Sequence, residues 1–240
     1  MTARSLSGWI PLKCAADRTP RELEENMKIL QLCVGMVGTN CYIFYDENTM
    51  EGAVVDPGDN GPAIVNAAKE HGVKITWVLL THGHFDHILG VKDVLRETGA
   101  KLAIHEDDLW MLTPEALSAS LRRFGLPSTA YEGIKPDILA KEGTQIQVGG
   151  LTVTWLHTPG HTPGSSCLRV GDVLFTGDTL FRHECGRCDL EGGDFSLMLK
   201  SLKRLHDLPG DMHVLPGHEG ASTLEEERRM NPYMRQAVGK

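Results

Sequence analysis

The chain has 240 residues, of which 41% are hydrophobic, and a formal net charge of −8 at pH 7. This length is enough for one complete hydrophobic core. An acidic chain without a basic stripe is not expected to bind nucleic acid, and no apolar run approaches the roughly 18 residues that a membrane span requires. The six cysteines lack framework spacing, which favours a reducing compartment, so we expect a cytoplasmic protein.

The first 26 residues differ from the rest of the chain. Trp9–Leu12 is too short for the core of a signal peptide and is not followed by a cleavage-type ending. Met27–Leu32 looks like a natural start that runs directly into a strand. We therefore expect residues 1–26 to be a leader or a disordered extension without a chemical role, and residues 27–240 to form a single domain.

Short strands dominate the first half. Proline at the first position and Gly72 past the end predict a helix over 62–71. Apolar residues at helical spacing predict another helix from Ile88 to Gly99. The apolar runs that predict strands are Ile29–Val34, Cys41–Tyr45, Gly52–Val55, Ile75–Leu80 and Lys101–His105.

Residues 106–143 have the weakest pattern. Asp107–Leu112 and Pro114–Phe124 have helical spacing, and the remainder is predicted to be a long connection. Long connections in compact domains are often functional, so we expect a flap on the substrate side here.

The second half contains two predicted hairpins, with turns at Gly149-Gly150 and Gly171-Asp172. A helix capped by Asp194, a strand over Met212–Leu215 and a helix from Thr223 to about Arg229 follow. Strands thus come in two groups, each followed by helices. The predicted fold class is α/β, a four-layer αββα sandwich of two mixed sheets with helices outside.

The segment Thr81–His87 carries the strongest chemical signal. It places His82, His84, Asp86 and His87 within six residues, just past a buried strand. Imidazole and carboxylate are ligands that Zn²⁺ and neighbouring first-row metals take. A polar surface loop is the alternative, and this density of ligand-type residues disfavours it. We interpret the segment as a metal site.

Three further polar residues follow apolar strands in the second half, each in a glycine-containing turn. They are His161, Asp178 and His218. Loops held by a rigid scaffold commonly carry catalytic groups. Together with the first cluster, these residues predict one shared site.

At this point the sequence resembles the metallo-β-lactamase superfamily, and within it the glyoxalase II-like branch. The similarity extends from about Met27 to Tyr233. Its motifs are Gly38-Thr39-Asn40-Cys41-Tyr42, Asp56-Pro57-Gly58, Thr81–His87, His157–Ser165, Gly177–Phe181, Pro216-Gly217-His218 and Glu226-Glu227-Arg228 with Asn231-Pro232.

The resemblance implies two divalent metal ions, most often zinc, with iron or manganese as alternatives. His82, His84 and His161 would bind the first ion. Asp86, His87 and His218 would bind the second, and Asp178 would bridge the two. No cysteine belongs to this set, which favours an open catalytic site over a closed structural one.

Two such ions can lower the pKa of a shared water to near 7. The expected reaction is hydrolysis of a small-molecule thioester such as S-lactoylglutathione by a metal-bound hydroxide, with Asp86 holding its proton. Arg187 is a candidate contact for the substrate. The longer glyoxalase II enzymes use an added C-terminal helical region for glutathione, and those contacts cannot be transferred, because only 22 residues follow His218.

Alternatives remain open. Cys185-Gly186-Arg187 also resembles persulfide dioxygenases, which use one iron in the same fold. A lactonase or β-lactamase would share the site, and a metal-stabilised binding module would lack turnover. Cys185 and Cys188 are interpreted as packing residues, with a redox pair or half a zinc site as the alternatives. The oligomeric state is left open.

Overall fold

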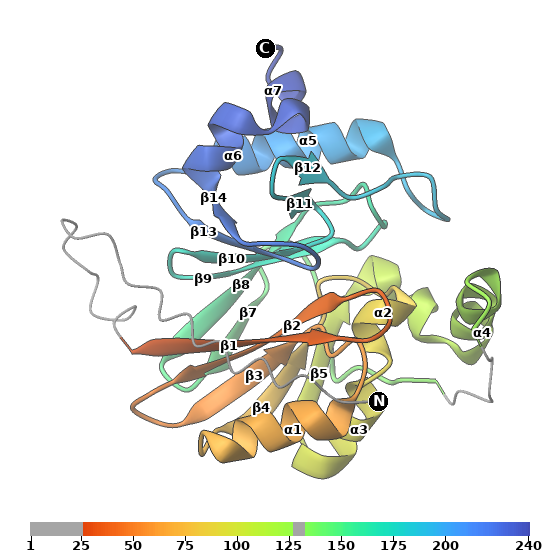
Figure 1. Ribbon diagram of the computed structural model, residues 1–240, viewed down its shortest axis with the longest axis vertical. Helices are drawn as coiled ribbons and strands as arrows, with labels where there is room; N and C mark the ends of the chain where they lie inside the picture. The colour runs from red at the N-terminus through yellow and green to blue at the C-terminus, as the bar shows by residue number, and fades with distance from the viewer. Residues whose placement is uncertain (1–25, 127–132) are drawn as a thin grey trace.

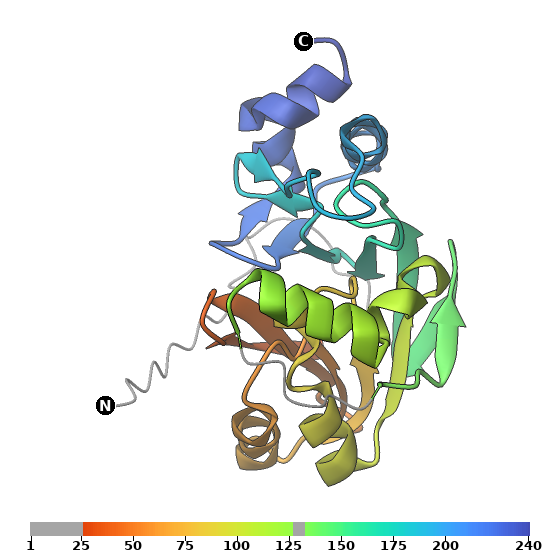
Figure 2. The same ribbon diagram turned by 90° about the vertical axis from the view of Figure 1, so that its right-hand side faces the viewer.

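The computed structural model describes residues 26–126 and 133–240. The prediction of a leader therefore falls almost entirely outside the described residues. Two six-stranded sheets face each other, and helices cover their outer faces (Figures 1 and 2). This arrangement confirms the four-layer αββα fold that the sequence predicts.

The first sheet is mixed. Its strands lie in chain order, antiparallel from β1 to β3 and parallel from β3 to β6. They are β1 (Met27–Val34), β2 (Thr39–Asp46), β3 (Glu51–Val55), β4 (Lys74–Leu79), β5 (Lys101–His105) and β6 (Ile138–Ala140).

The second sheet has the order β14-β13-β10-β9-β8-β7, with β10 and β13 parallel and the other pairs antiparallel. A two-stranded ribbon of β11 (Leu180–Phe181) and β12 (Glu184–Cys185) lies beside it. The strands of the sheet are β7 (Gln145–Val148), β8 (Leu151–His157), β9 (Ser166–Val170), β10 (Val173–Gly177), β13 (His213–Pro216) and β14 (Ser222–Thr223).

The helices fall into three groups. Those that cover the first sheet are α1 (Gly61–Glu70) and α3 (Val91–Thr98). Those beyond the second sheet are α5 (Phe195–His206), α6 (Leu224–Met230) and α7 (Pro232–Ala237). At the edge where the two sheets meet lie α2 (Phe85–Ile88), the 3₁₀ helix η1 (Glu106–Leu112) and α4 (Pro114–Arg123), with α4 in front in Figure 2. No helix among the described residues has the length and apolarity needed to cross a bilayer.

Alternation along β2 explains how its sheet separates two cores. Tyr42 and Phe44 face the second sheet, where both rings contact Phe175 at centroid distances of 5.4 Å. Cys41 and Ile43 point the opposite way, into the core beneath α1 and α3. Successive side chains of a strand point to opposite faces, so one buried strand contributes to both layers. A third core lies between the second sheet and α5–α7.

One local expectation was confirmed with a later start, and one was wrong. The helix predicted from Ile88 to Gly99 is α3, which begins at Val91 and has Gly99 as its C-cap, while Ile88 ends the separate short helix α2. Between the two helices the Gly90 N–H donates to the Pro57 carbonyl at 2.8 Å. The long connection after α4 includes β6, a three-residue strand that pairs with β5. Its main-chain bonds to β5 stabilise a strand too short to show a periodic pattern.

Candidate metal centre

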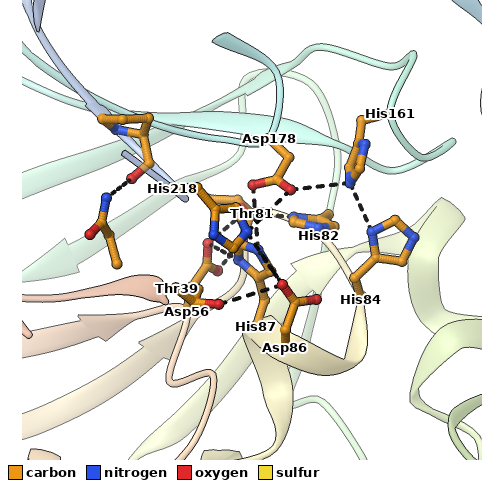
Figure 3. A network of polar contacts seen from close by, with 12 residues as sticks. Thr39, Asp56, Thr81, His82, His84, Asp86, His87, His161, Asp178 and His218 are labelled. Atoms are coloured by element: carbon orange, nitrogen blue, oxygen red, sulfur yellow. Dashed lines mark hydrogen bonds and ion pairs between the residues drawn. The ribbon is translucent and has the colours of Figure 1, made fainter. Parts of the chain in front are cut away.

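All seven predicted ligands gather at one end of the two sheets (Figure 3). Four come from the first half of the chain, past β4 and on α2, and three come from turns after strands of the second sheet. The turns after β8, β10 and β13 hold His161, Asp178 and His218. Each strand delivers its polar residue to the same end, so residues more than 130 positions apart in sequence become neighbours.

His82, His84 and His161 form the first group, with one nitrogen of each within 4.8 Å of the others. His84 Nδ1 and His161 Nε2 face each other at 2.8 Å (Figure 3). Ring nitrogens that converge in this way can share a cation.

Asp86, His87 and His218 form the second group, again with ligand atoms within 4.8 Å of one another. His218 Nε2 lies 3.3 Å from Asp86 Oδ2. The two residues come from opposite halves of the chain.

Asp178 lies between the two groups. Its Oδ1 is 3.4 Å from His87 Nε2, while its Oδ2 is 3.4 Å from His161 Nε2 and 3.7 Å from His218 Nε2. The carboxylate therefore contacts members of both groups, and its Oδ2 alone faces one imidazole of each, as a bridging ligand would.

The buried carboxylate of Asp56 orients two of the imidazoles. Its Oδ2 accepts from His87 Nδ1 at 2.9 Å and from the Thr81 hydroxyl at 2.6 Å, and that hydroxyl lies 3.0 Å from His82 Nδ1. Both rings thereby keep Nε2 free to face the centre of the site. Residues behind metal-binding histidines commonly fix the ring orientation in this way. The sequence motif Asp56-Pro57-Gly58 was interpreted only as a turn and a family marker. The signal for its role in the site was the position of Asp56 directly after a strand, which it shares with the candidate ligands.

Asp108 is a second carboxylate that sequence reasoning missed. It is fully buried and accepts from the Gly83 N–H at 3.1 Å, the Thr162 hydroxyl at 2.7 Å and the Gly164 N–H at 2.6 Å. It thus joins the turn of His82 and His84 to the turn of His161. Burial raises the pKa of Asp108.

Arg187 acts on the site through its backbone. Its carbonyl accepts from His161 Nδ1 at 2.7 Å, which leaves Nε2 for the centre. Its guanidinium lines the pocket above the site but is held by Asp189 at 2.6 and 2.7 Å. The predicted substrate contact by this side chain stays a prediction.

Three glycines permit close packing at the centre. A Cβ on Gly217 would lie 2.3 Å from Asp178 Oδ1, and one on Gly186 would lie 1.8 Å from the Asp178 carbonyl oxygen. A Cβ on Gly58 would lie 1.8 Å from the Asp86 carbonyl oxygen. Any larger residue at these positions would displace a candidate ligand.

Three candidate ligands have the protonation state that binds metals, whereas neighbouring carboxylates raise the pKa of His87 and of His218 against the effect of burial. Burial lowers the pKa of His82 far below its usual value, and burial with the charge of His161 lowers that of His84 to about 3, so both rings are neutral at pH 7. Burial opposes the charge on Asp178, yet His87 and the other imidazoles hold its pKa well below the usual range. Neutral imidazole and ionised carboxylate are the forms that bind metals.

Three buried atoms at the centre have no hydrogen-bond partner among the described residues. They are His82 Nε2, His87 Nε2 and Asp178 Oδ1. Buried polar atoms are almost always paired, so unpartnered atoms on His82 of the first group, on His87 of the second and on Asp178 between them suit the coordination of cations. The residues present therefore fit divalent metal ions.

Other histidines and the two cysteines of the Cys185–Cys188 segment lie outside this centre. His157 stacks on His105 at a centroid distance of 4.0 Å, and its Nε2 donates to the Pro163 carbonyl. His183 lies 2.9 Å from Glu226. Cys185 and Cys188 are free thiols that pack with the third core.

This fold and this site define a metal-dependent hydrolase. The family model of the metallo-beta-lactamase superfamily matches residues 34–218. The chain belongs to this superfamily.

Several known proteins are similar to the chain. The hydroxyacylglutathione hydrolase GloC of Haemophilus influenzae is 31% identical over 81% of this chain and 92% of its own length. Among solved structures, the BLEG-1 B3 metallo-beta-lactamase has a TM-score of 0.79 and 33% identity, covering 86% of this chain and 99% of its own. TTHA1623, solved in a di-iron-bound form, has a TM-score of 0.76 and 32% identity, and the match covers 85% of this chain and 99% of its own. ETHE1 from Myxococcus xanthus has a TM-score of 0.72 and 27% identity, and the match covers 89% of this chain and 86% of its own.

Proposed function

We propose that the protein is a binuclear metal-dependent thioesterase that hydrolyses S-lactoylglutathione or a related acyl thioester. The observation that carries the proposal is Asp178, whose carboxylate lies within 3.7 Å of His161 from the first ligand group and of His87 and His218 from the second. The similarity to GloC, a hydroxyacylglutathione hydrolase, supports the thioester. The donor set of imidazoles and carboxylates suits zinc first, and the di-iron form of TTHA1623 supports iron as the alternative.

When bound, the two ions supply an activated water and polarise the carbonyl oxygen of the substrate. His82, His84 and His161 would hold one ion, and Asp86, His87 and His218 would hold the other, with Asp178 between them. The turns that carry them are fixed by Asp56 and Asp108, so the ligands need little rearrangement.

Asp86 has a second role in this proposal. Its Oδ2 accepts from the Thr39 hydroxyl at 3.4 Å and faces His218 Nε2. Burial opposes ionisation of Asp86, but His87 and the His218 contact lower its pKa, so the carboxylate is ionised and can accept a proton from the attacking water at Oδ2. A thiolate leaving group, with a pKa near 8.5, departs without a general acid.

A second candidate is a persulfide dioxygenase with one iron ion. The segment Cys185-Gly186-Arg187 and the likeness to ETHE1 at 27% identity favour it. A lactonase or β-lactamase activity is a third, favoured by the likeness to BLEG-1. We place the enzyme in the cytoplasm, which the five free cysteines of the described residues support.

The test measures metal content and hydrolysis of S-lactoylglutathione for the wild type and for Asp178→Ala. Asp207→Ala serves as the control, because Asp207 is the exposed C-cap residue of α5 and pairs with Lys203. We expect about two metals per chain and rapid hydrolysis in the wild type and the control, with both lost in Asp178→Ala.

Other outcomes discriminate the candidates. One iron per chain, no hydrolysis and oxygen uptake that depends on a glutathione persulfide would identify the dioxygenase. Two metals per chain without cleavage of any thioester would reject the thioesterase and direct the assay to lactones and β-lactams.

A further inference from the structure

A pocket of about 590 Å³ opens above the metal centre. Its floor includes five of the candidate ligands, which are His84, Asp86, His161, Asp178 and His218. A volume of this size holds a drug-sized molecule, which is far larger than a lactoyl group. Any substrate that reaches the metal ions must occupy this pocket.

One wall of the pocket is apolar and is built by η1 and α4. Trp110 and Met111 come from η1, Leu117 lies in the middle of α4, and Phe124 lies at its end. The Phe124 ring contacts Phe85 of α2 at a centroid distance of 4.9 Å, so the aromatic surface continues down to the metal-binding helix.

This wall is open to solvent. Phe124 is 45% exposed and Trp110 is 37% exposed. Large apolar side chains grouped beside a binding site indicate a ligand that covers them. An aromatic group of the substrate would gain both burial of apolar area and ring contacts here.

Two arginines line the pocket, Arg187 and Arg123, and only Arg187 forms an ion pair with a described carboxylate. The Arg187 guanidinium is neutralised by Asp189. Arg123, in the last turn of α4, also lines the pocket and interacts electrostatically with the same Asp189, but it forms no ion pair with a described carboxylate. The pocket therefore offers an apolar wall and one cation that can receive a carboxylate.

We infer that the enzyme prefers thioesters whose acyl group is bulky and apolar, such as an arylacetyl group, over the small polar lactoyl group. This inference rests on the proposed thioesterase function. The thiol part of the proposed substrate, glutathione, is polar and anionic, so the apolar wall fits the acyl part. Arg123 receives a carboxylate of the thiol part, and Phe124 determines the acyl preference.

The test compares kcat/KM for S-phenylacetylglutathione and S-lactoylglutathione on the metal-loaded enzyme. We expect the wild type to prefer the phenylacetyl thioester about tenfold, and Phe124→Ala to remove most of that preference through KM, since small apolar differences in a pocket discriminate by factors of this order. Phe195→Ala is the matched control, because Phe195 is 41% exposed at the start of α5 and does not line the pocket. Arg123→Gln is expected to raise KM for both thioesters alike.

A wild type that prefers S-lactoylglutathione, or a Phe124→Ala variant that loses activity equally on both thioesters, would overturn the inference. Binding of the product acids, measured by calorimetry, separates this failure from failure of the thioesterase. If no thioester is cleaved, the proposed function falls, whereas phenylacetate that binds more tightly than lactate and loses affinity in Phe124→Ala still supports the apolar pocket.

Discussion

Asp108 orients the metal centre without facing its middle. One carboxylate holds the backbone of Gly83, next to His82 and His84, and the hydroxyl of Thr162, next to His161. A hydrogen bond to a charged acceptor contributes about 1.5–3 kcal/mol. The relative placement of His82, His84 and His161 therefore depends on Asp108, which holds the two turns that carry them.

We predict that Asp108→Asn weakens metal binding at the site of His82, His84 and His161 by about 10- to 100-fold, the usual effect of losing an outer-shell partner. The amide accepts at only one end, so either the Gly164 N–H or the Gly83 N–H loses its acceptor. Competition with a chelator and the visible spectrum of the cobalt-substituted protein measure the effect. Asp107→Asn, at the exposed neighbouring position, is the control, and equal affinity in the two variants would disprove the positioning role.

Gly217 gives a second prediction for a single residue. A methyl group there would meet Asp178 Oδ1 at 2.3 Å and His87 Cε1 at 2.7 Å, whereas one on Gly220 would meet nothing within 4 Å. We expect Gly217→Ala to displace Asp178 and to reduce metal content and kcat/KM by at least about tenfold. Gly220→Ala should leave both unchanged. Metal analysis beside the hydrolysis assay checks this, and full metal content in Gly217→Ala would contradict it.

The sequence predicts those site residues whose ligand-type side chains are clustered in one short segment. His82, His84 and Asp86 are conspicuous because ligand types crowd into one short segment after a strand. Asp108 was not predictable, because its partners lie 25 to 56 residues away and the pattern around it is weak. The contribution of Arg187 comes from a carbonyl, which carries no residue-specific signal.

Among the elements, α5 is tied to the end of β8, which precedes the turn of His161, through the ion pair of Arg204 with Glu142 in the loop between β6 and β7. Glu142 accepts from the His157 N–H at 2.8 Å and from Arg204 Nη1 at 2.7 Å, and Arg204 also donates to the His157 carbonyl. The hydrogen bond from Arg204 lowers the pKa of Glu142. The pair fixes the end of the strand that carries the turn.

This pair predicts a pH-dependent difference in stability. A carboxyl whose folded pKa lies below its unfolded value of 4.5 stabilises the fold above that pH and loses the effect as pH falls through the folded pKa. Glu142→Gln should therefore lower the free energy of unfolding by on the order of 1 kcal/mol at pH 7, since the pair is partly exposed, and by less below pH 4.5. Urea unfolding of the metal-free proteins at pH 7 and below pH 4.5 measures this difference, with Glu70→Gln on α1 as the control. A difference that stays constant with pH would contradict the assignment.

Elements with a strong local pattern were predictable, and short ones were not. The apolar run of β2 and the apolar spacing of α5 identify both. The division between α2 and α3 depends on the contact of Gly90 with Pro57, which belongs to another part of the fold. For β6 the deciding interactions are the main-chain bonds to β5.

In the whole molecule, the metal centre joins the two halves of the sandwich. His82–His87 belong to the side of the first sheet, and His161, Asp178 and His218 belong to the second. Ions bound by both halves stabilise the folded chain, because the unfolded chain does not assemble the site.

We predict that removal of metal with a chelator lowers Tm by about 10 °C, since tight binding at 1,000 times Kd stabilises by about 4 kcal/mol and each kcal/mol shifts Tm by about 2–4 °C in a chain of this size. Calorimetry before chelation, after chelation and after zinc is returned measures the change. Asp178→Ala should melt at the lower temperature with or without zinc. Complete metal loss without a change in Tm would show that the layers hold together by packing alone.

The carbonyl of Arg187 that orients His161 has a consequence for how such enzymes diversify. Every residue type supplies the same acceptor, so the side chain at the pocket mouth can be exchanged while the imidazole keeps its orientation. Substitutions at position 187 are therefore expected to change which substrates enter the pocket, while the carbonyl that orients His161 is kept. Libraries that randomise position 187 should therefore yield many active members with altered selectivity.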